Sequence, residues 1–220
     1  MAKTIIHKDN KAFFGDKDHL ELSKKISFSA LIFELLSEKS PKEDELKVFE
    51  LVLNLSIDHG AETPSARAVI EVANKGASIS EAVASGIKAI DDIHGGAGEG
   101  AMEVFYKIKE EDLDPKEVVT SYLETERKVP GYGHRIYKVD PRAELLLETA
   151  SEAGIGTDYI KIAKSIEGEL KSQTGKILPV NIDGAMAVIF CAFNWEPRLA
   201  KAVFIIARTP GLCGQFLNNE

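Results

Sequence analysis

The residues best suited to chemistry lie in one short stretch, from Val129 to Arg142, which reads VPGYGHRIYKVDPR. Gly131 and Gly133 permit positive φ angles and let a ligand approach the backbone closely. His134 is the titratable group at the end of this loop, and it is followed by Arg135, Lys138 and Arg142. An imidazole among positive charges favours an anionic ligand, although loops of this composition are also common as plain solvated surface.

The end of this stretch is typical of a helix start. Asp140 followed by Pro141 predicts an N-cap and a proline at the first helical position. Arg142 would then lie in the first turn, where the helix dipole is positive. Together these features outline a site for a carboxylate or a phosphate.

Two other places put a polar group in a glycine-rich or apolar setting. His94 precedes Gly95 and Gly96, and we expect it to end a helix and interact with the helix dipole. Asp183 lies in a largely apolar run, where an N-cap for the following helix would explain it. A titratable group at a helix end also has its pKa set by that position, so acid–base chemistry is the alternative for both residues.

The composition limits the domain count and the classes of function that the chain can have. With 220 residues and 44% hydrophobic content, we expect about one large domain with a packed core. The net charge of -8 argues against a nucleic-acid binder or an anionic-membrane binder. Without a signal peptide or an apolar run that spans a bilayer, the chain is expected to be soluble and cytoplasmic. Cys191 and Cys213 have no metal-ligand spacing, so we predict buried, reduced thiols and no metal.

Helical signals follow one another along the chain. Apolar spacing predicts a helix from about 20 to 38, and Ser40-Pro41 with Glu43 predicts the start of a second. Further starts are predicted at Thr63-Pro64, Ser78 with Glu81, Asp114-Pro115, Asp140-Pro141 and Glu196-Pro197. Only residues 3 to 7 hint at a strand, so the predicted fold class is all-α with about ten helices.

Three motifs in a fixed order, HGGA, then PGYGH with DPR, then NID, resemble the citrate synthase superfamily over about Leu51 to Phe216. The resemblance implies a catalytic trio of His94, His134 and Asp183. It also implies that the carboxylates of oxaloacetate or citrate are held by His59, Arg142 and Arg208. Coenzyme A would be bound by Val129, Pro130, Gly131, Tyr132, Gly133, Lys176 and Ile177.

The resemblance further implies an architecture. We expect a citrate-synthase-like multi-helix fold with a large helical domain at roughly 1–105 and 178–220. A small helical lobe would occupy roughly 106–177. The long apolar helices and glycine-rich helix ends favour a homodimer packed helix against helix, as the family resemblance also implies.

The residue types fit the chemistry of an acetyl-CoA enol. Asp183 would move the methyl proton while His94 donates to the thioester oxygen. His134 would polarise the keto group or, in the cleavage direction, accept the proton of the tertiary hydroxyl. Arg142 and Arg208 would clamp carboxylates through paired hydrogen bonds.

Within the superfamily, the chain looks most like the citryl-CoA lyase module of ATP-citrate lyase, because of Asp183-Gly184, Asp58-His59-Gly60 and the short chain. That module cleaves citryl-CoA to acetyl-CoA and oxaloacetate, with citryl-CoA synthetase subunits as possible partners. A citrate synthase is the alternative, and a non-catalytic homologue that binds coenzyme A or a partner subunit is a second alternative. Three departures from the family pattern motivate that last reading: the end at Glu220 before a C-terminal arm, Gln215 in place of a common histidine, and the closeness of Arg142 to His134.

Overall fold

The computed structural model describes residues 4–219, and it confirms a mostly helical chain. Eleven helices and three short strands lie in that range, one helix more than the sequence predicts. Contacts divide the chain into two compact units, Met1–Glu50 and Leu51–Glu220. No helix among the described residues is long and apolar enough to cross a membrane.

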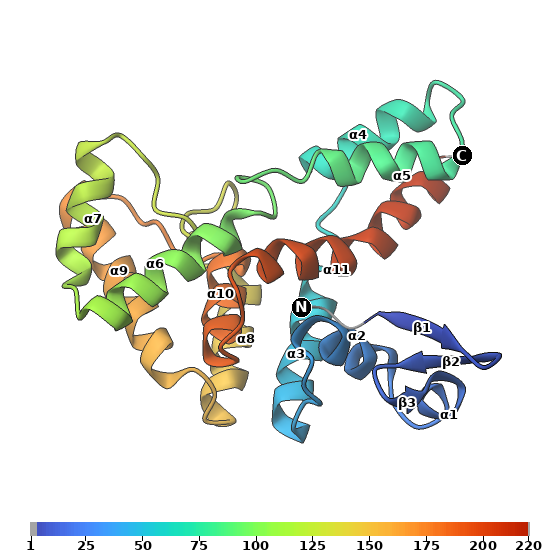
Figure 1. The fold of residues 1–220 in the computed structure, drawn as a ribbon. Helices are drawn as coiled ribbons and strands as arrows, with labels where there is room; N and C mark the ends of the chain where they lie inside the picture. The colour runs from blue at the N-terminus through green and yellow to red at the C-terminus, as the bar shows by residue number, and fades with distance from the viewer. Residues whose placement is uncertain (1–3, 220) are drawn as a thin grey trace. The chain divides into compact units, whose positions relative to one another are not determined.

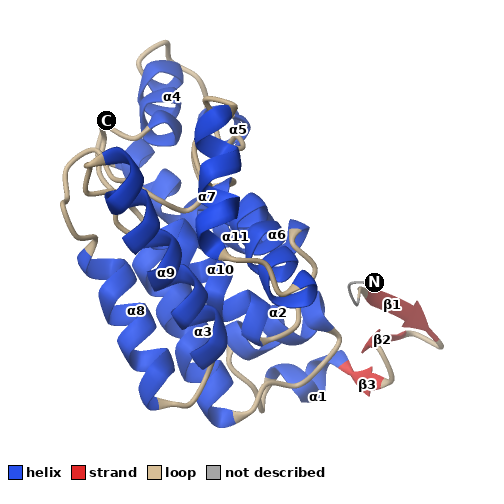
Figure 2. Ribbon diagram, turned by 90° about the vertical axis from the view of Figure 1, so that its left-hand side faces the viewer, coloured by secondary structure: helices blue, strands red, loops and turns tan. Residues whose placement is uncertain are grey.

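The first unit begins with more strand than predicted. Strands β1 (Ile5–Lys8), β2 (Lys11–Phe14) and β3 (Lys17–Asp18) form an antiparallel sheet in that order, drawn in red in Figure 2. The helix predicted from 20 to 38 is two helices, α1 (His19–Ser23) and α2 (Phe28–Ser37). The break falls where Ser27 caps α2 by accepting from the backbone N–H of Ala30.

The core of this unit explains where its last helix begins. Phe33 and Phe49 meet edge to face at 5.3 Å between ring centroids, and buried Glu34 pairs with Lys17 at 2.8 Å. The Ser40 hydroxyl donates to Glu34 at 3.1 Å, so it does not cap the next helix as predicted. Helix α3 (Glu43–Ser56) therefore begins later than the serine indicated, and it runs from the first unit into the second.

Most predicted helix starts of the second unit are confirmed. Its helices are α4 (Pro64–Ala73), α5 (Ile79–Lys88), α6 (Ala97–Glu111), α7 (Pro115–Glu124), α8 (Pro141–Glu152), α9 (Thr157–Thr174), α10 (Ile182–Ala192) and α11 (Arg198–Leu217). The caps at Thr63, Ser78, Asp114 and Asp140 all accept backbone hydrogen bonds as predicted. Helix α11 begins at Arg198 without a side-chain cap, because Glu196 pairs with the Arg198 side chain at 2.6 Å instead.

Helix α10 is the centre of the second unit. It packs against α6, α8 and α9, and Figure 1 shows it enclosed by them. Its residues from Gly184 to Cys191 are all buried, which accounts for its apolar sequence. Cys191 is buried in this core, whereas Cys213 on α11 is only partly buried, so the prediction of two buried thiols is correct for one of them. Both cysteines are free.

A second cluster joins α4 and α5 to the far end of α11, and Figure 1 shows these three helices side by side. Its buried residues are Val69, Ala82, Val83, Leu212 and Phe216. Within α11, Pro210 precedes Gly211, where a Cβ atom would lie 2.0 Å from the Ile57 carbonyl oxygen. Glycine is therefore needed for the segment after α3 to lie on α11. The division into a large domain and a lobe at 106–177 stays a prediction; in that stretch α7 packs on α9.

Candidate active site

The loop before His134 pairs with the segment before Asp183. Gly133 N–H donates to the Pro179 carbonyl at 2.7 Å, and Asn181 N–H donates to the Gly131 carbonyl at 3.0 Å. Gly131 has a φ of +83°, and a Cβ atom there would lie 2.7 Å from Gly184 Cα. Only glycine allows this approach, so the glycine loop and the start of α10 are held together as one platform.

Asp140 ties this platform to Arg142. Its side chain is fully buried and caps α8 by accepting from Arg142 N–H at 3.1 Å. The Arg142 guanidinium bonds back to both carboxylate oxygens, at 3.1 Å from Nε and 2.9 Å from Nη2. Ile182 N–H, at the start of α10, also donates to Asp140 at 3.1 Å. Burial alone would raise the pKa of Asp140, but the hydrogen bonds and charge of Arg142 outweigh it and lower the pKa.

His134 lies just beyond the glycine loop, and both of its ring nitrogens have neighbours. Its Nδ1 accepts from the backbone N–H groups of Ile136 and Tyr137, each at 3.1 Å. Arg142 Nη2 carries two N–H groups, so it can donate both to Asp140 at 2.9 Å and to His134 Nε2 at 3.4 Å. Both ring nitrogens of His134 therefore face hydrogen-bond donors, the backbone at Nδ1 and Arg142 at Nε2.

The contacts of His94 assign its proton. It does not end a helix as predicted but lies in the turn before α6, where Asp91 accepts from its backbone N–H. Its Nε2 lies 2.8 Å from the Ser65 hydroxyl and accepts from Ser65 N–H at 3.4 Å, in the first turn of α4. Burial, aided by the charge of Arg208, lowers the pKa of His94 to about 4. His94 is therefore neutral at pH 7 and carries its proton on Nδ1.

Asp183 is not the N-cap of α10. That position belongs to Asn181, whose side chain accepts from Gly184 N–H at 3.1 Å. Asp183 lies in the first turn, and its Oδ1 is shut off from solvent with no hydrogen-bond partner in the described part of the chain. Burial raises the pKa of Asp183 to about 6, against the opposing charges of Arg142 and Arg208. A carboxyl that holds its proton near neutral pH is suited to acid–base work.

Arg208 is a buried cation with a free donor. Its Nε donates to the Ser56 carbonyl at 2.8 Å, and its guanidinium lies over the Phe204 ring, 4.7 Å from the centroid. The same Phe204 ring meets His94 edge to face at 6.1 Å. Arg208 Nη1 is buried and has no partner among residues 4–219. Burial lowers the pKa of Arg208, yet an arginine stays charged, so this donor is available for an anionic ligand.

His59 lies against His134. The two imidazole rings are 5.5 Å apart between centroids and nearly perpendicular. Next to it, Asp58 accepts from the Gln215 side chain at 3.0 Å, and its Oδ1 is buried without a partner among the residues described. Gln215, which departs from the family pattern, thus fixes the turn that carries His59 to α11.

The predicted coenzyme A segments lie beside one another. In the glycine loop, Gly133 pairs with Pro179 and Gly131 pairs with Asn181. These partners are close in sequence to Lys176 and Ile177. Val129 is buried, whereas Lys176 and Ile177 are exposed just after Gly175, the C-cap of α9. Val129 is therefore a core residue, and Lys176 and Ile177 are the members of the predicted set most open to a ligand.

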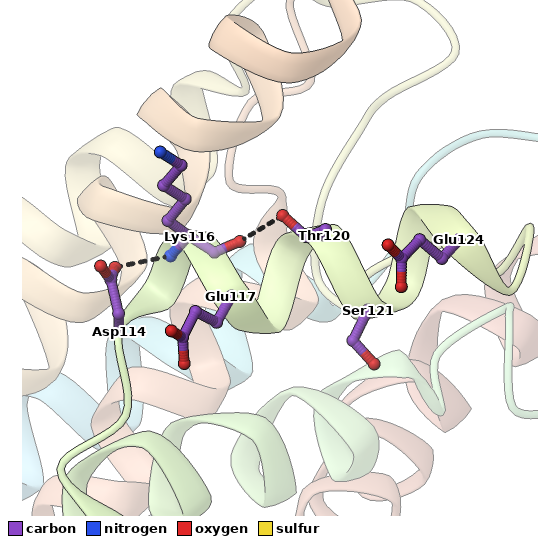
Figure 3. A pocket seen from close by; sticks show the side chains of 6 residues that line it. All are labelled: Asp114, Lys116, Glu117, Thr120, Ser121 and Glu124. Carbon is purple, nitrogen blue, oxygen red and sulfur yellow. Dashed lines mark hydrogen bonds between the residues drawn. The ribbon is translucent and has the colours of Figure 1, made fainter.

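A recess elsewhere carries none of the predicted site residues. Figure 3 shows it on α7, lined by Asp114, Lys116, Glu117, Thr120, Ser121 and Glu124. Three carboxylates against one lysine disfavour an anionic ligand there. Separately, no group of three or more His, Cys, Asp or Glu side chains within residues 4–219 is arranged to hold a metal ion.

Three contributors to the site are not predicted from the sequence: Ser65, Phe204 and the ion-pair role of Asp140. Ser65 follows the predicted Thr63-Pro64 helix start, so a donor in that first turn could be foreseen, but its histidine partner could not. Phe204 lies one helical turn before Arg208, a spacing that allows a stacked pair on one helix face.

Comparison with known proteins places the chain. Residues 2–220 match the model of the citrate synthase C-terminal domain. The chain belongs to the citrate synthase family. The structure of citryl-CoA lyase from Hydrogenobacter thermophilus is 34% identical, with a TM-score of 0.89, over 100% of this chain and 86% of that one.

Two other relatives are longer than this chain. The citrate synthase of Haloferax volcanii is 28% identical over 202 residues, which are 90% of this chain and 52% of that protein. ATP citrate lyase from Methanosaeta concilii, solved with (3S)-citryl-CoA, is 23% identical with a TM-score of 0.89, over 99% of this chain and 38% of that one. At that identity the likeness shows the fold alone. The chain spans about half the length of the Haloferax citrate synthase it matches.

Proposed function

We propose that this chain is a citryl-CoA lyase that cleaves citryl-CoA to acetyl-CoA and oxaloacetate. The observation that supports the proposal is a pair of groups suited to proton chemistry, both acted on by the charge of Arg208: His94 with its proton on Nδ1 and Asp183 with a raised pKa. The 34% identity to a citryl-CoA lyase over the whole chain supports the lyase over the synthase.

Each group has a task in the cleavage. The tertiary hydroxyl loses its proton, the carbon–carbon bond breaks, and its electron pair passes to the thioester carbonyl to form the enol of acetyl-CoA. His94 donates from Nδ1 to the thioester oxygen as negative charge develops there. Asp183 then gives its proton to the enol carbon and completes acetyl-CoA. His134 would accept the proton of the tertiary hydroxyl, whose oxygen becomes the keto group of oxaloacetate.

The arginines would bind the carboxylates. Arg208 has a free, buried Nη1 for a strong charge-assisted hydrogen bond. Arg142 is oriented by Asp140, which uses its Nε and Nη2 and leaves Nη1 for a ligand. Coenzyme A would lie along the glycine loop and at Lys176 and Ile177. The proposal includes assembly of this chain as a homodimer, with citryl-CoA synthetase subunits as possible further partners.

Citrate synthase is the second candidate, because the same groups serve bond formation and 28% identity links the chain to a synthase. The test supplies citryl-CoA and follows oxaloacetate by coupled reduction, beside a reaction that starts from acetyl-CoA and oxaloacetate. Cleavage as the dominant reaction is expected, and net citrate formation would favour the synthase. Asp183→Asn should slow cleavage by about 10²-fold or more. Coenzyme A binding without turnover would favour the non-catalytic homologue.

A further inference from the structure

His134 and Asp183 lie on different segments of the chain, although the proposed cleavage uses them on one substrate. His134 would accept the hydroxyl proton, and Asp183 would protonate the enol carbon. His134 follows the glycine loop, whereas Asp183 lies in the first turn of α10. A misplacement of about 1 Å between reacting groups can slow a reaction by about 10²-fold. The loop must therefore be fixed to the helix.

The Asn181 side chain joins these two segments directly. Its Nδ2 donates to the carbonyl of Gly133, the residue before His134, at 3.0 Å. Its Oδ1 accepts from the N–H of Gly184, the residue after Asp183, at 3.1 Å. A single amide group is thus bonded at the same time to the chain neighbours of both residues.

The backbone bonds between the two segments leave one peptide group to Asn181. Asn181 N–H donates to the Gly131 carbonyl at 3.0 Å, and Gly133 N–H donates to the Pro179 carbonyl at 2.7 Å. Gly133 has a φ of +86° and no side chain that would restrict the peptide group that follows it. Among the described residues, the carbonyl of that peptide group, which leads into His134, accepts only from the Asn181 side chain.

A plain N-cap would not need the Nδ2 donor. Serine and aspartate cap a helix about as well as asparagine, because each presents an oxygen to the N–H groups of the first turn. Of these three residue types, only asparagine carries an acceptor and a donor on separate atoms. Asn181 uses both atoms, which is more than the start of α10 requires.

We propose that Asn181 is a positioning residue that fixes the placement of His134 relative to Asp183, an assignment that rests on the proposed lyase function. It acts through the Gly133 carbonyl and the Gly184 N–H. The donor holds the start of the segment that carries His134, and the acceptor holds the turn that carries Asp183. Loss of the donor alone should loosen His134 while α10 stays capped.

The test removes the donor and keeps the cap. Asn181→Ser should lower kcat for citryl-CoA cleavage by about tenfold or more. Exchange of the acetyl-CoA methyl protons with D2O, in the presence of succinate, needs Asp183 and His94 but not His134, because succinate has no keto oxygen. This exchange should persist within about threefold of wild type. Asn54→Ser, on the exposed side of α3, is the matched control and should change neither rate.

Amide hydrogen exchange measures the link between the segments without turnover. In Asn181→Ser, the peptide 129–142 should exchange faster than in wild type, whereas α10 from Ala185 onward should be unchanged. Asn181→Asp is the second variant if Asn181→Ser folds poorly, because aspartate keeps the cap and the shape of the side chain. At pH 7 its carboxylate cannot donate to the Gly133 carbonyl, so the same peptide should exchange faster.

Three outcomes decide between the roles of Asn181. Wild-type cleavage and wild-type amide exchange in both variants would make Asn181 a plain N-cap and overturn the proposal. A parallel loss of cleavage and methyl-proton exchange would also overturn it, since a general structural defect lowers both. A wild-type protein that does not cleave citryl-CoA, with faster exchange of 129–142 in Asn181→Ser, would refute the lyase function and leave the link through Asn181 standing.

Discussion

Two helices of the second unit start with the same local sequence, an aspartate, a proline and a basic residue. Asp114-Pro115-Lys116 begins α7, and Asp140-Pro141-Arg142 begins α8. Both aspartates cap their helix by accepting from the N–H two residues on, at 2.8 Å in α7 and 3.1 Å in α8. Figure 3 shows the first of these caps on an exposed helix end. At the level of the backbone the two starts are alike.

Their surroundings are different. Asp114 is exposed and its carboxylate accepts only from the Lys116 backbone among the described residues, while the Lys116 amino group points away from it in Figure 3. Asp140 has no exposed surface, holds the guanidinium of Arg142 and accepts from Ile182 N–H. The same short pattern therefore makes a helix cap in one place and a structural centre of the site in the other. Burial and the nearness of α10 decide which.

The largest expected effect is a loss of stability when Asp140, but not Asp114, is replaced by alanine. Asp140→Ala leaves the Arg142 charge and the Ile182 N–H without their partner in a buried place. We expect it to lower the free energy of unfolding by about 3 to 5 kcal/mol, the scale for removing one partner of a buried pair. Urea unfolding monitored by circular dichroism measures this change.

The control for this variant also removes the Arg142 charge, which Asp140→Ala leaves without its partner. Asp140→Ala combined with Arg142→Leu should recover part of the lost stability, because no unpaired charge is then buried. A loss of only about 1 kcal/mol for Asp140→Ala would mean that Asp140 acts as a plain cap. The contrast with Asp114 would then disappear.

Asp183 and Asp140 are expected to change the stability of the protein with pH in opposite directions. Burial raises its folded pKa to about 6, above the unfolded value of 3.8, so the folded protein holds an extra proton between these values. Wild-type stability must therefore fall, relative to Asp183→Asn, as pH rises from about 4 to 6. We expect the difference to reach on the order of 2 to 3 kcal/mol at pH 7 and to vanish below pH 4.

Unfolding in urea across this pH range measures the difference. Asp140 has the opposite sign, because its lowered pKa gives stability that is present above about pH 4 and is lost as pH falls through the folded pKa. A pH-independent difference between wild type and Asp183→Asn would show that Asp183 ionises normally. It would also remove the physical basis for its role as the proton donor.

The comparison also explains how far the sequence leads. Caps such as Thr63, Ser78, Asp114 and Asp140 are predictable because a cap is made within four residues of chain. The all-α class follows from such signals together with apolar spacing. Of the three-stranded sheet at the start, the sequence indicates only the first strand, through residues 3 to 7, because strands of two to four residues are too short to establish a period.

In the candidate active site, too, some features are predictable from local sequence and others depend on tertiary contacts. The ordered motifs led to His94, His134 and Asp183, but the proton positions depend on partners distant in sequence or on turn geometry, such as Ser65 for His94. The sequence allows Asp183 to be an N-cap, yet Asn181 holds that position because its side chain accepts from Gly184 N–H. Local sequence gives the residue types, whereas the tautomers and the shifted pKa values come from tertiary packing.

The smallest expected effect is on the exposed aspartate. Asp114→Ala removes one cap acceptor from α7, and water can replace it because that end of the helix is solvated. The free energy of unfolding should fall by about 1 kcal/mol, and the rate of citryl-CoA cleavage should stay at the wild-type level. The same urea and coupled oxaloacetate assays measure both. A loss as large as that of Asp140→Ala, or a slower cleavage, would mean that the Asp-Pro-basic pattern itself makes the residue critical. The distinction between the two helix starts would then lie in their shared sequence and not in burial.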